Sequence, residues 1–312
     1  MNRGRYYRRR SLRKGSRGVV SVVGTLLSLL VFFALFGLFL TQYVPVWMTD
    51  NESAWSAQTQ ASMAQLQSYI ESQVVLRAPN VYATPFTMES GSIPLIAQPT
   101  QGTLTFGAAV LNTATSNPLL TYTPSDGFSL GGYGGTTLTQ NFPTGFVQMQ
   151  LPNRYYIAQT YQLENDAVIV TQGPNSQYIQ FPPLLSMVTE GANTSVAIEI
   201  VQLGGNSTQS VFQGTQDIYT HFVNSQPVTF NQTSGFTVTL SSYTHYPCAW
   251  WNFYNTTAQN SNVAGANWAT DNPLGCVSAD TTLAETQLVI QHVTTFTYVL
   301  GELTVTAGVG SQ

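Results

Sequence analysis

The chain has 312 residues, of which 8% are Asp, Glu, Lys or Arg, and its formal net charge at pH 7 is −4. That average combines two unlike parts, because eight of the ten Lys and Arg residues lie in Met1–Gly18 and all fourteen acidic residues follow Thr49. The long acidic part lacks the basic face that a nucleic-acid partner requires, and its low charge disfavours a soluble cytosolic enzyme.

The first predicted element is a membrane-spanning helix. An uncharged run from Val19 to Thr49 follows the basic segment 1–18 directly. Its first 26 residues, Val19–Val44, span about 39 Å as a helix, more than the roughly 30 Å of bilayer hydrocarbon. Because basic flanks stay in the cytoplasm, we expect a single-pass protein of the cell membrane, with a cytoplasmic basic leader (1–18) and an extracellular C-terminal domain.

The junction between the leader and the helix carries a second signal. A secretory signal peptide has a short apolar core followed by a cleavage site with small residues, and no such arrangement appears before Trp47. Instead, Lys14-Gly15-Ser16-Arg17-Gly18-Val19-Val20-Ser21-Val22-Val23-Gly24 places two basic-Gly pairs before the apolar run. This resembles the N-terminus of archaeal type IV pilin-like surface proteins, whose leader peptidase cuts after a basic-Gly pair and leaves the helix on the mature protein.

The resemblance implies cleavage between Gly18 and Val19, after Arg17, with the bond between Gly15 and Ser16 as the second choice. The glutamate that bacterial pilins carry near the start of the mature helix is absent here. The alternative is an uncleaved signal anchor, which has the same topology. In either case membrane lipid is a partner, and the resemblance implies like or related pilin-type subunits as further partners through the helix.

We expect the helix to continue outside the membrane, so that the helical region covers 19–76. Pro45 is expected to kink it, and Tyr43 and Trp47 are expected among the lipid headgroups. An apolar stripe at helical spacing then needs cover from the chain's own β domain or from another subunit; it consists of Met63, Leu66, Ile70 and Val74. Because Pro79 disfavours helical geometry in the residue before it, the helix should end there, and the proline-rich segment 77–101 reads as a connector.

Residues 102–312 are predicted to form an extracellular domain with an antiparallel β-sandwich-like fold. The whole chain is then mainly β with one long N-terminal α-helix. Hydrophobic residues alternate with polar ones in five segments, Leu104–Phe106, Val147–Leu151, Val196–Ile200, Phe236–Leu240 and Phe296–Leu300. Residues Tyr161–Val170 read as a hairpin with Glu164-Asn165-Asp166 as its turn. A helix is predicted over Cys248–Gln259, with Trp250 and Tyr254 packing it onto the sheet. A possible seam between two lobes lies at 173–183.

The body of the chain carries further resemblances to archaeal surface proteins that pair a pilin-like helix with a β domain. The first is Asn153-Arg154-Tyr155-Tyr156, followed by Gln159-Thr160-Tyr161, Glu164, Ala167-Val168-Ile169-Val170 and Gln172-Gly173. The second is the Thr237–Leu240 strand that leads to Ala249-Trp250 and an aromatic pair. The family is largely uncharacterised, so the resemblance implies architecture rather than an activity.

Two further patterns suit an extracellular, oxidising location. Five Asn-x-Ser/Thr acceptors for glycosylation lie beyond the membrane segment, at Asn51, Asn193, Asn206, Asn231 and Asn255. Cys248 and Cys276 are the only cysteines, and in such a compartment they are expected to form one disulfide, the alternative being two buried free thiols.

The sequence contains no pattern that requires catalysis. Gly127-Phe128-Ser129-Leu130-Gly131 matches the letters of a nucleophile elbow, but the flanking residues predict a Gly-rich loop over 127–135 rather than a strand and a helix. His221, His245 and His292 are scattered, and Asp126 and Asp217 have no partner acid at motif spacing. We therefore expect no catalytic residues, no metal and no cofactor.

Three functional interpretations follow from these patterns. The favoured one is a structural or adhesive surface protein, as a minor filament component or as part of the cell surface. The second is a membrane-tethered module that binds surface glycans on exposed tyrosines and tryptophans; exposure of Trp250 and Trp251 would favour it and their burial would count against it. The third is an extracellular hydrolase with clustered carboxylates or a His-containing triad.

Overall fold

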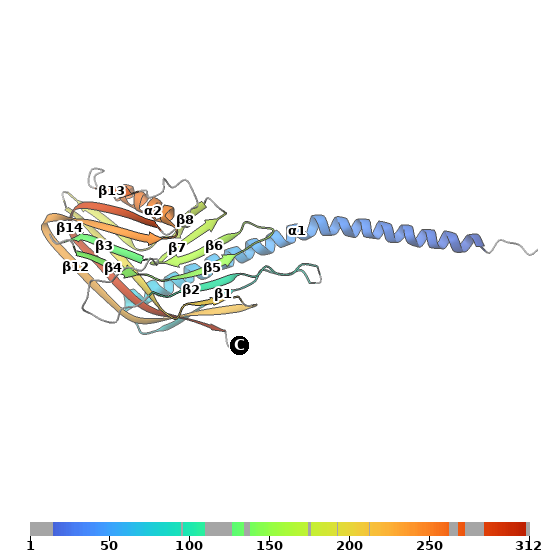
Figure 1. Cartoon of the computed structure of the whole chain (residues 1–312), viewed down its shortest axis with the longest axis horizontal. Coiled ribbons are helices and arrows are strands. Elements are labelled where there is room, and N and C mark those ends of the chain that lie inside the picture. Colours follow the sequence, from blue (N-terminus) through green and yellow to red (C-terminus); the bar gives the residue numbers. More distant parts are fainter. Residues whose placement is uncertain are drawn as a thin grey trace, which may run out of the picture.

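The computed structural model describes residues 15–94, 96–109, 127–133, 138–173, 176–191, 193–211, 213–261, 268–271 and 284–309. The fold is mainly β with one long N-terminal helix, as predicted. Figure 1 shows the helix projecting from one end of a two-sheet domain, with its second half lying along the sheets.

Helix α1 (Gly15–Leu76) is continuous for 62 residues, and Pro45 lies inside it. Burial divides this helix into two halves. The side chains from Ser21 to Phe36 are exposed, whereas the predicted stripe of Met63, Leu66, Ile70 and Val74 is buried. The stripe is covered by the chain's own β domain, which settles the choice that the periodicity left open.

The larger sheet has eight strands and is mixed. Its main path runs β4-β3-β12-β14-β10-β9, with β1 paired to β12 and β13 paired to β14. Its only parallel pair among the described residues is β10 with β14. The bounds are β1 (Val81–Thr87), β3 (Gly127–Tyr133), β4 (Leu138–Pro143), β9 (Leu185–Glu190), β10 (Asn193–Gly205), β12 (Thr215–Thr244), β13 (Trp268–Asp271) and β14 (Ala284–Val309).

The smaller sheet has six strands, in the order β11-β2-β5-β6-β7-β8, and is antiparallel throughout. The bounds are β2 (Thr103–Gly107), β5 (Phe146–Leu151), β6 (Gln159–Glu164), β7 (Ala167–Gln172), β8 (Ser176–Phe181) and β11 (Thr208–Ser210). The predicted hairpin is confirmed as β6–β7, with Asn165 and Asp166 at positive φ in a two-residue turn. Each of the two sheets contains strands that precede the predicted seam at 173–183 in the sequence and strands that follow it.

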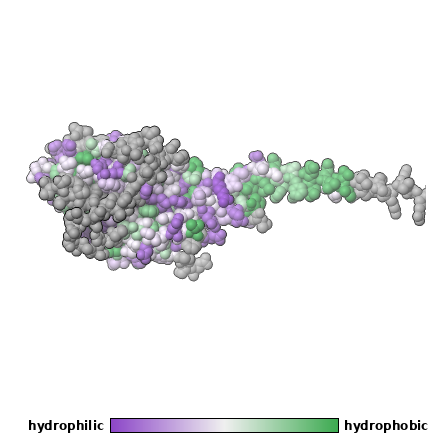
Figure 2. Space-filling view, in the orientation of Figure 1, coloured by the Kyte–Doolittle hydropathy of each residue, from purple (hydrophilic) through white to green (hydrophobic). Residues whose placement is uncertain are grey.

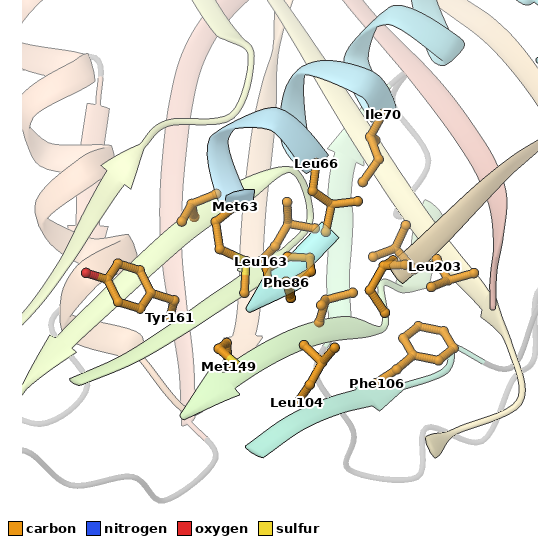
Figure 3. Packing of buried hydrophobic residues seen from close by; sticks show 14 of the residues in the cluster. Met63, Leu66, Ile70, Phe86, Leu104, Phe106, Met149, Tyr161, Leu163 and Leu203 are labelled. Atoms are coloured by element: carbon orange, nitrogen blue, oxygen red, sulfur yellow. The ribbon is translucent and has the colours of Figure 1, made fainter. Parts of the chain in front are cut away.

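Two hydrophobic clusters form the core. One joins α1 to both sheets, and Figure 3 shows Met63, Leu66 and Ile70 pointing from the helix toward Leu163 and Leu203 of the two sheets. The other lies under helix α2 (Pro247–Asn260), which confirms the helix expected at 248–259. In α2, Trp250 and Tyr254 are almost fully buried against this cluster, as predicted.

Two local expectations are corrected. The connector contains strand β1, in which Thr84 and Phe86 are buried. Pro85 is tolerated because, within the part of the chain that the structure describes, β1 pairs with β12 alone and forms an edge of the sheet. The Gly-rich loop predicted at 127–135 is wrong for 127–133, which forms β3, while 134–135 lie outside the described residues. Backbone hydrogen bonds to β4 and β12 hold β3, so the glycines need no side-chain contacts there.

Candidate functional site

The exposed half of α1 is the most conspicuous functional feature. Among the described residues, α1 is the one helix long and apolar enough to cross a membrane. Figure 2 shows a continuous hydrophobic surface along the projecting helix, whereas the coloured part of the domain mixes hydrophilic residues with scattered hydrophobic ones. An apolar helix face without protein cover needs lipid or other helices around it.

An aromatic group lies at the C-terminal end of this apolar segment. The Phe39 ring stacks on Tyr43 and meets the Trp47 ring edge-on, with centroids 5.7 Å apart in both pairs. Tyr43 and Trp47 are about half exposed. Rings of this kind favour the boundary between hydrocarbon and headgroups where a helix crosses a membrane. Next to them along the helix, Val44 and Met48 are already buried.

Glu52 ties the helix to two loops at that point. Its side chain is fully buried, and its Oε1 accepts hydrogen bonds from Thr100 Oγ1 (2.7 Å) and from the Arg154 backbone N–H (3.1 Å). Its Oε2 accepts from the backbone N–H groups of Tyr155 and Tyr156, both at 2.7 Å. One carboxylate therefore joins α1, the segment before β2 and the loop between β5 and β6.

These bonds also determine the protonation state of Glu52. Burial alone raises the pKa of the Glu52 carboxyl, but the hydrogen bonds from Thr100 and from three backbone N–H groups outweigh burial and lower the pKa below 4.5. Because this pKa is lowered in the folded state, the stability that Glu52 contributes is present at neutral pH. It is lost as the pH falls through the folded-state pKa.

Further along the helix, side-chain amides and an indole fix α1 to the sheets. Trp55 Nε1 donates to Thr87 O at 2.7 Å, Gln67 Nε2 to Asp166 O at 2.7 Å, and Gln73 Nε2 to Thr220 O at 3.0 Å. The acceptors are backbone carbonyls of β1, the β6–β7 turn and β12. The domain and the second half of α1 therefore form one packed unit.

Three carboxyl groups, one of them on α1, form a cluster where this helix packs on the β domain. Asp166 in the β6–β7 turn and Glu199 in β10 are buried, and Glu71 of α1 interacts electrostatically with both. Burial and the neighbouring carboxyls raise the pKa of Asp166 well above 3.8 and raise the pKa of Glu199 from 4.5 to about 7. Asp166 and Glu199 therefore keep their protons to a higher pH than ordinary carboxyl groups. Among the described residues, no group of three or more His, Cys, Asp or Glu side chains is placed to hold a metal ion.

The raised pKa values in this carboxyl cluster predict that Glu199 destabilises the fold more at pH 8 than in mild acid. Because the pKa of Glu199 is raised in the folded state, its contribution to stability falls as the pH rises from about 4.5 to about 7. We expect Glu199→Gln to raise the urea midpoint at pH 8 and to leave it almost unchanged at pH 4.5. Urea titrations of both proteins at the two pH values test this, and a midpoint lowered at pH 8 would contradict it.

Glu164 is a buried acid that contacts the hydrophobic cluster under α2. Its Oε1 accepts from Trp250 Nε1 at 2.7 Å and from the Thr244 hydroxyl, and its Oε2 accepts from Gln162 Nε2 at 2.6 Å. Nearby, the Tyr254 hydroxyl lies 2.6 Å from Ser242 Oγ. Burial raises the pKa of Tyr254, so its hydroxyl stays protonated. These contacts dock α2 on the sheet and occupy both oxygens of the Glu164 carboxylate.

The predicted modification residues take different positions. Residues 17–19 of the predicted cleavage point lie in the first turns of α1. The side chains of Asn193, Asn206 and Asn231 are exposed. The other two acceptors are half-buried on helices and already hydrogen-bonded: Asn51 Nδ2 donates to Gly91 O, and Asn255 Oδ1 accepts from Gln259.

Cys248 is buried near the start of α2, and Cys276 lies outside the described residues, so their disulfide stays a prediction. The three histidines lie on different segments: His221 within β12, His245 just after it, and His292 within β14 at positive φ. Asp217 lies in β12, and Asp126 lies outside the described residues. Asp217 and His221 therefore share strand β12, four positions apart, whereas His245 and His292 lie on other segments.

Glu52 is the site residue that sequence reasoning missed. No local motif marks it, because its partners lie 48 to 104 positions away along the chain. The sequence did carry one signal, because Glu52 lies three residues beyond the uncharged run that ends at Thr49. An acid in that position needs hydrogen-bond partners if the folded domain packs around it. Comparison with family models, curated proteins and solved structures finds no match for this chain.

Proposed function

We propose that this protein is a membrane-anchored, pilin-like extracellular protein with a structural or adhesive role, either as a minor component of a surface filament or as part of the cell surface. The observation that carries the proposal is the division of α1. One half of a single continuous helix is apolar and exposed, and the other half is packed under the β domain. The proposal assigns no catalytic activity.

The charge distribution supports the proposed orientation. The basic residues cluster before the apolar helix, whereas the β domain is acidic and carries exposed glycosylation acceptors at Asn193, Asn206 and Asn231. Basic flanks stay on the cytoplasmic side of a membrane helix. The resemblance of residues 14–24 to archaeal pilin-like leaders adds processing between Gly18 and Val19, which retains the helix on the mature protein.

Assembly into a filament would require the apolar half of α1 to exchange lipid for neighbouring helices. Exposing that surface to water costs tens of kcal/mol at about 25 cal/mol per Å², so partner helices must cover it as it leaves the bilayer. Gly24 and Ser28, and Gly37 and Thr41, are small residues four positions apart that allow close helix approach. A Cβ added at Gly24 or Gly37 meets no atom within 4 Å, so both faces are open to a partner.

Glycan binding through the tryptophans of α2 has less support. Trp250 is 1% exposed and donates its indole N–H to Glu164, so its ring is not available as a stacking platform. Trp251 is half-buried. Of the two tryptophans, Trp250 is therefore not available for glycan stacking, and Trp251 is only partly so.

Processing at Gly18 is the feature that most sharply separates a pilin-like protein from a signal anchor. We expect Gly18→Leu to leave the basic leader attached, because the peptidase of the resembled family requires the small residue before the cut. Gly24→Leu is the matched control, since Gly24 lies in the exposed helix without neighbours and should leave processing intact. Mass spectrometry of the N-terminal peptide reads out both variants. An unchanged mature N-terminus in Gly18→Leu would reject the preferred cleavage point, and Gly15→Leu then tests the second one.

A further inference from the structure

The end of the β domain from which α1 emerges carries exposed apolar side chains on two loops. In the loop between β1 and β2, Ile96 is 41% exposed; in the loop between β5 and β6, Tyr155 and Ile157 are 44% and 52% exposed. Arg154, next to Tyr155, is also exposed. We propose that these four residues, the membrane-facing rim, dock the β domain onto the lipid headgroups of the membrane that holds α1.

Hydrogen bonds fix the height of both loops along the helix. The Thr49 hydroxyl lies 3.3 Å from Tyr155 O, and Asn51 Nδ2 lies 3.3 Å from Gly91 O. Glu52 binds the same two loops through Thr100 and the backbone of Arg154–Tyr156. Figure 1 shows the β1–β2 loop reaching alongside α1 at this end of the domain.

That height matches the headgroup layer. Thr49 is two residues from Trp47, a rise of about 3 Å, and the headgroup layer on each side of a bilayer is roughly 5–8 Å thick. With the aromatic group of Tyr43 and Trp47 at the boundary, the loop attached to Thr49 lies within the same layer. The rim is therefore continuous with the membrane contact of the helix itself.

The chemistry of the rim also fits lipid. Tyr155 has an apolar ring and a polar hydroxyl, a combination that favours the interface, while Ile96 and Ile157 are apolar. A guanidinium such as that of Arg154 pairs with phosphate. The other basic residue of the exported part, Arg77, lies beyond the opposite end of α1, 25 residues and about 38 Å from Glu52.

The rim is not strongly cationic, because Asp50 is exposed on the same turn of α1 as Asn51 and Glu52. Zwitterionic phospholipid should therefore be enough for docking. The inference rests on α1 being a membrane anchor, but it does not depend on leader cleavage or on filament formation. It implies that, while α1 anchors the protein, the rim end of the β domain contacts the membrane surface and the opposite end of the domain faces away from the membrane.

The test uses full-length protein in nanodiscs of zwitterionic phospholipid. The photo-cross-linking residue p-benzoylphenylalanine is placed singly at Tyr155 or Ile96, and at two controls. Val223 in β12 has similar exposure (53%) but lies near the far end of the domain, where Gln73 binds Thr220; Leu30 lies in the apolar half of α1. After irradiation, intact-protein mass spectrometry counts lipid adducts.

We expect lipid adducts at Tyr155 and Ile96 to exceed those at Val223 several-fold. Arg154→Gln should lower the yield at position 155. Adducts at Leu30 together with a background yield at Tyr155 and Ile96 would overturn the rim while leaving the anchor in place, whereas no adduct at Leu30 would overturn both. Protein–protein adducts at Tyr155 or Ile96, in place of lipid adducts, would assign the surface to a second copy and likewise overturn the inference.

Discussion

Replacing Leu66 by Ala is expected to lower the free energy of unfolding of the β domain by about 3–5 kcal/mol. Leu66 is fully buried in the cluster that joins α1 to both sheets, and Figure 3 shows it directed toward Phe86 and Leu163. Truncation removes buried methyl groups and leaves a cavity that two sheets and a helix cannot readily close. Urea unfolding of monomeric, detergent-solubilised protein, followed by tryptophan fluorescence, measures the loss.

Leu76→Ala is the matched control for this variant. It makes the same change on the same helix, but Leu76 is 66% exposed, so the expected loss is within about 0.5 kcal/mol. Equal losses in the two variants would mean that the domain does not depend on its packing against the second half of α1. A large loss at Leu66 alone in the monomer supports cover by the chain's own domain rather than by another subunit.

Glu52→Ala is expected to lower the free energy of unfolding by about 2–4 kcal/mol, because hydrogen bonds to a charged acceptor are worth more than neutral ones and four donors lose theirs together. Thr100 and the N–H groups of Arg154–Tyr156 are those donors. The effect should appear locally as faster amide exchange in residues 153–157 and 100–102. Urea unfolding and hydrogen-exchange mass spectrometry at pH 7 measure both.

Asp50→Asn controls for the loss of a negative charge at this end of the helix, since Asp50 is exposed and should change stability by less than about 0.5 kcal/mol. Glu52→Gln keeps the shape but places an amide NH₂ where one oxygen accepts, so its loss should be intermediate. If Glu52→Ala and Asp50→Asn were equally stable, the junction would not depend on this carboxylate. Lowering the pH through the folded-state pKa of Glu52 should reduce the difference between Glu52→Ala and the unaltered protein.

Regular periodicity made much of the fold predictable. The stripe from Met63 to Val74 and the alternating strands gave the helix, the β class and most of the core, and the Asn165–Asp166 turn gave the β6–β7 hairpin. Such patterns are local consequences of burying one face of a helix or strand. The burial of Trp250 and Tyr254 followed from their spacing on α2 in the same way.

What the sequence did not predict depends on distant pairing. Strand β1 was hidden by Pro85, which an edge strand accepts, and β3 was hidden by glycines that pair through backbone bonds with β12, more than a hundred residues away. The parallel pairing of β10 with β14 also joins segments about a hundred residues apart. Glu52 belongs to the same class, because its acceptor role exists only after two loops have folded against α1.

The central claim is that α1 is retained as the membrane anchor of a processed, pilin-like surface protein. The most direct measurement is the mature N-terminal residue of the native protein, determined by mass spectrometry in the membrane fraction and in material sheared from the cell surface. The account predicts a start at Val19, with Ser16 as the second choice, and recovery in the sheared fraction would add assembly into filaments. A start at Met1 or Asn2, confined to membranes, would contradict pilin-type processing and leave a signal-anchored surface domain.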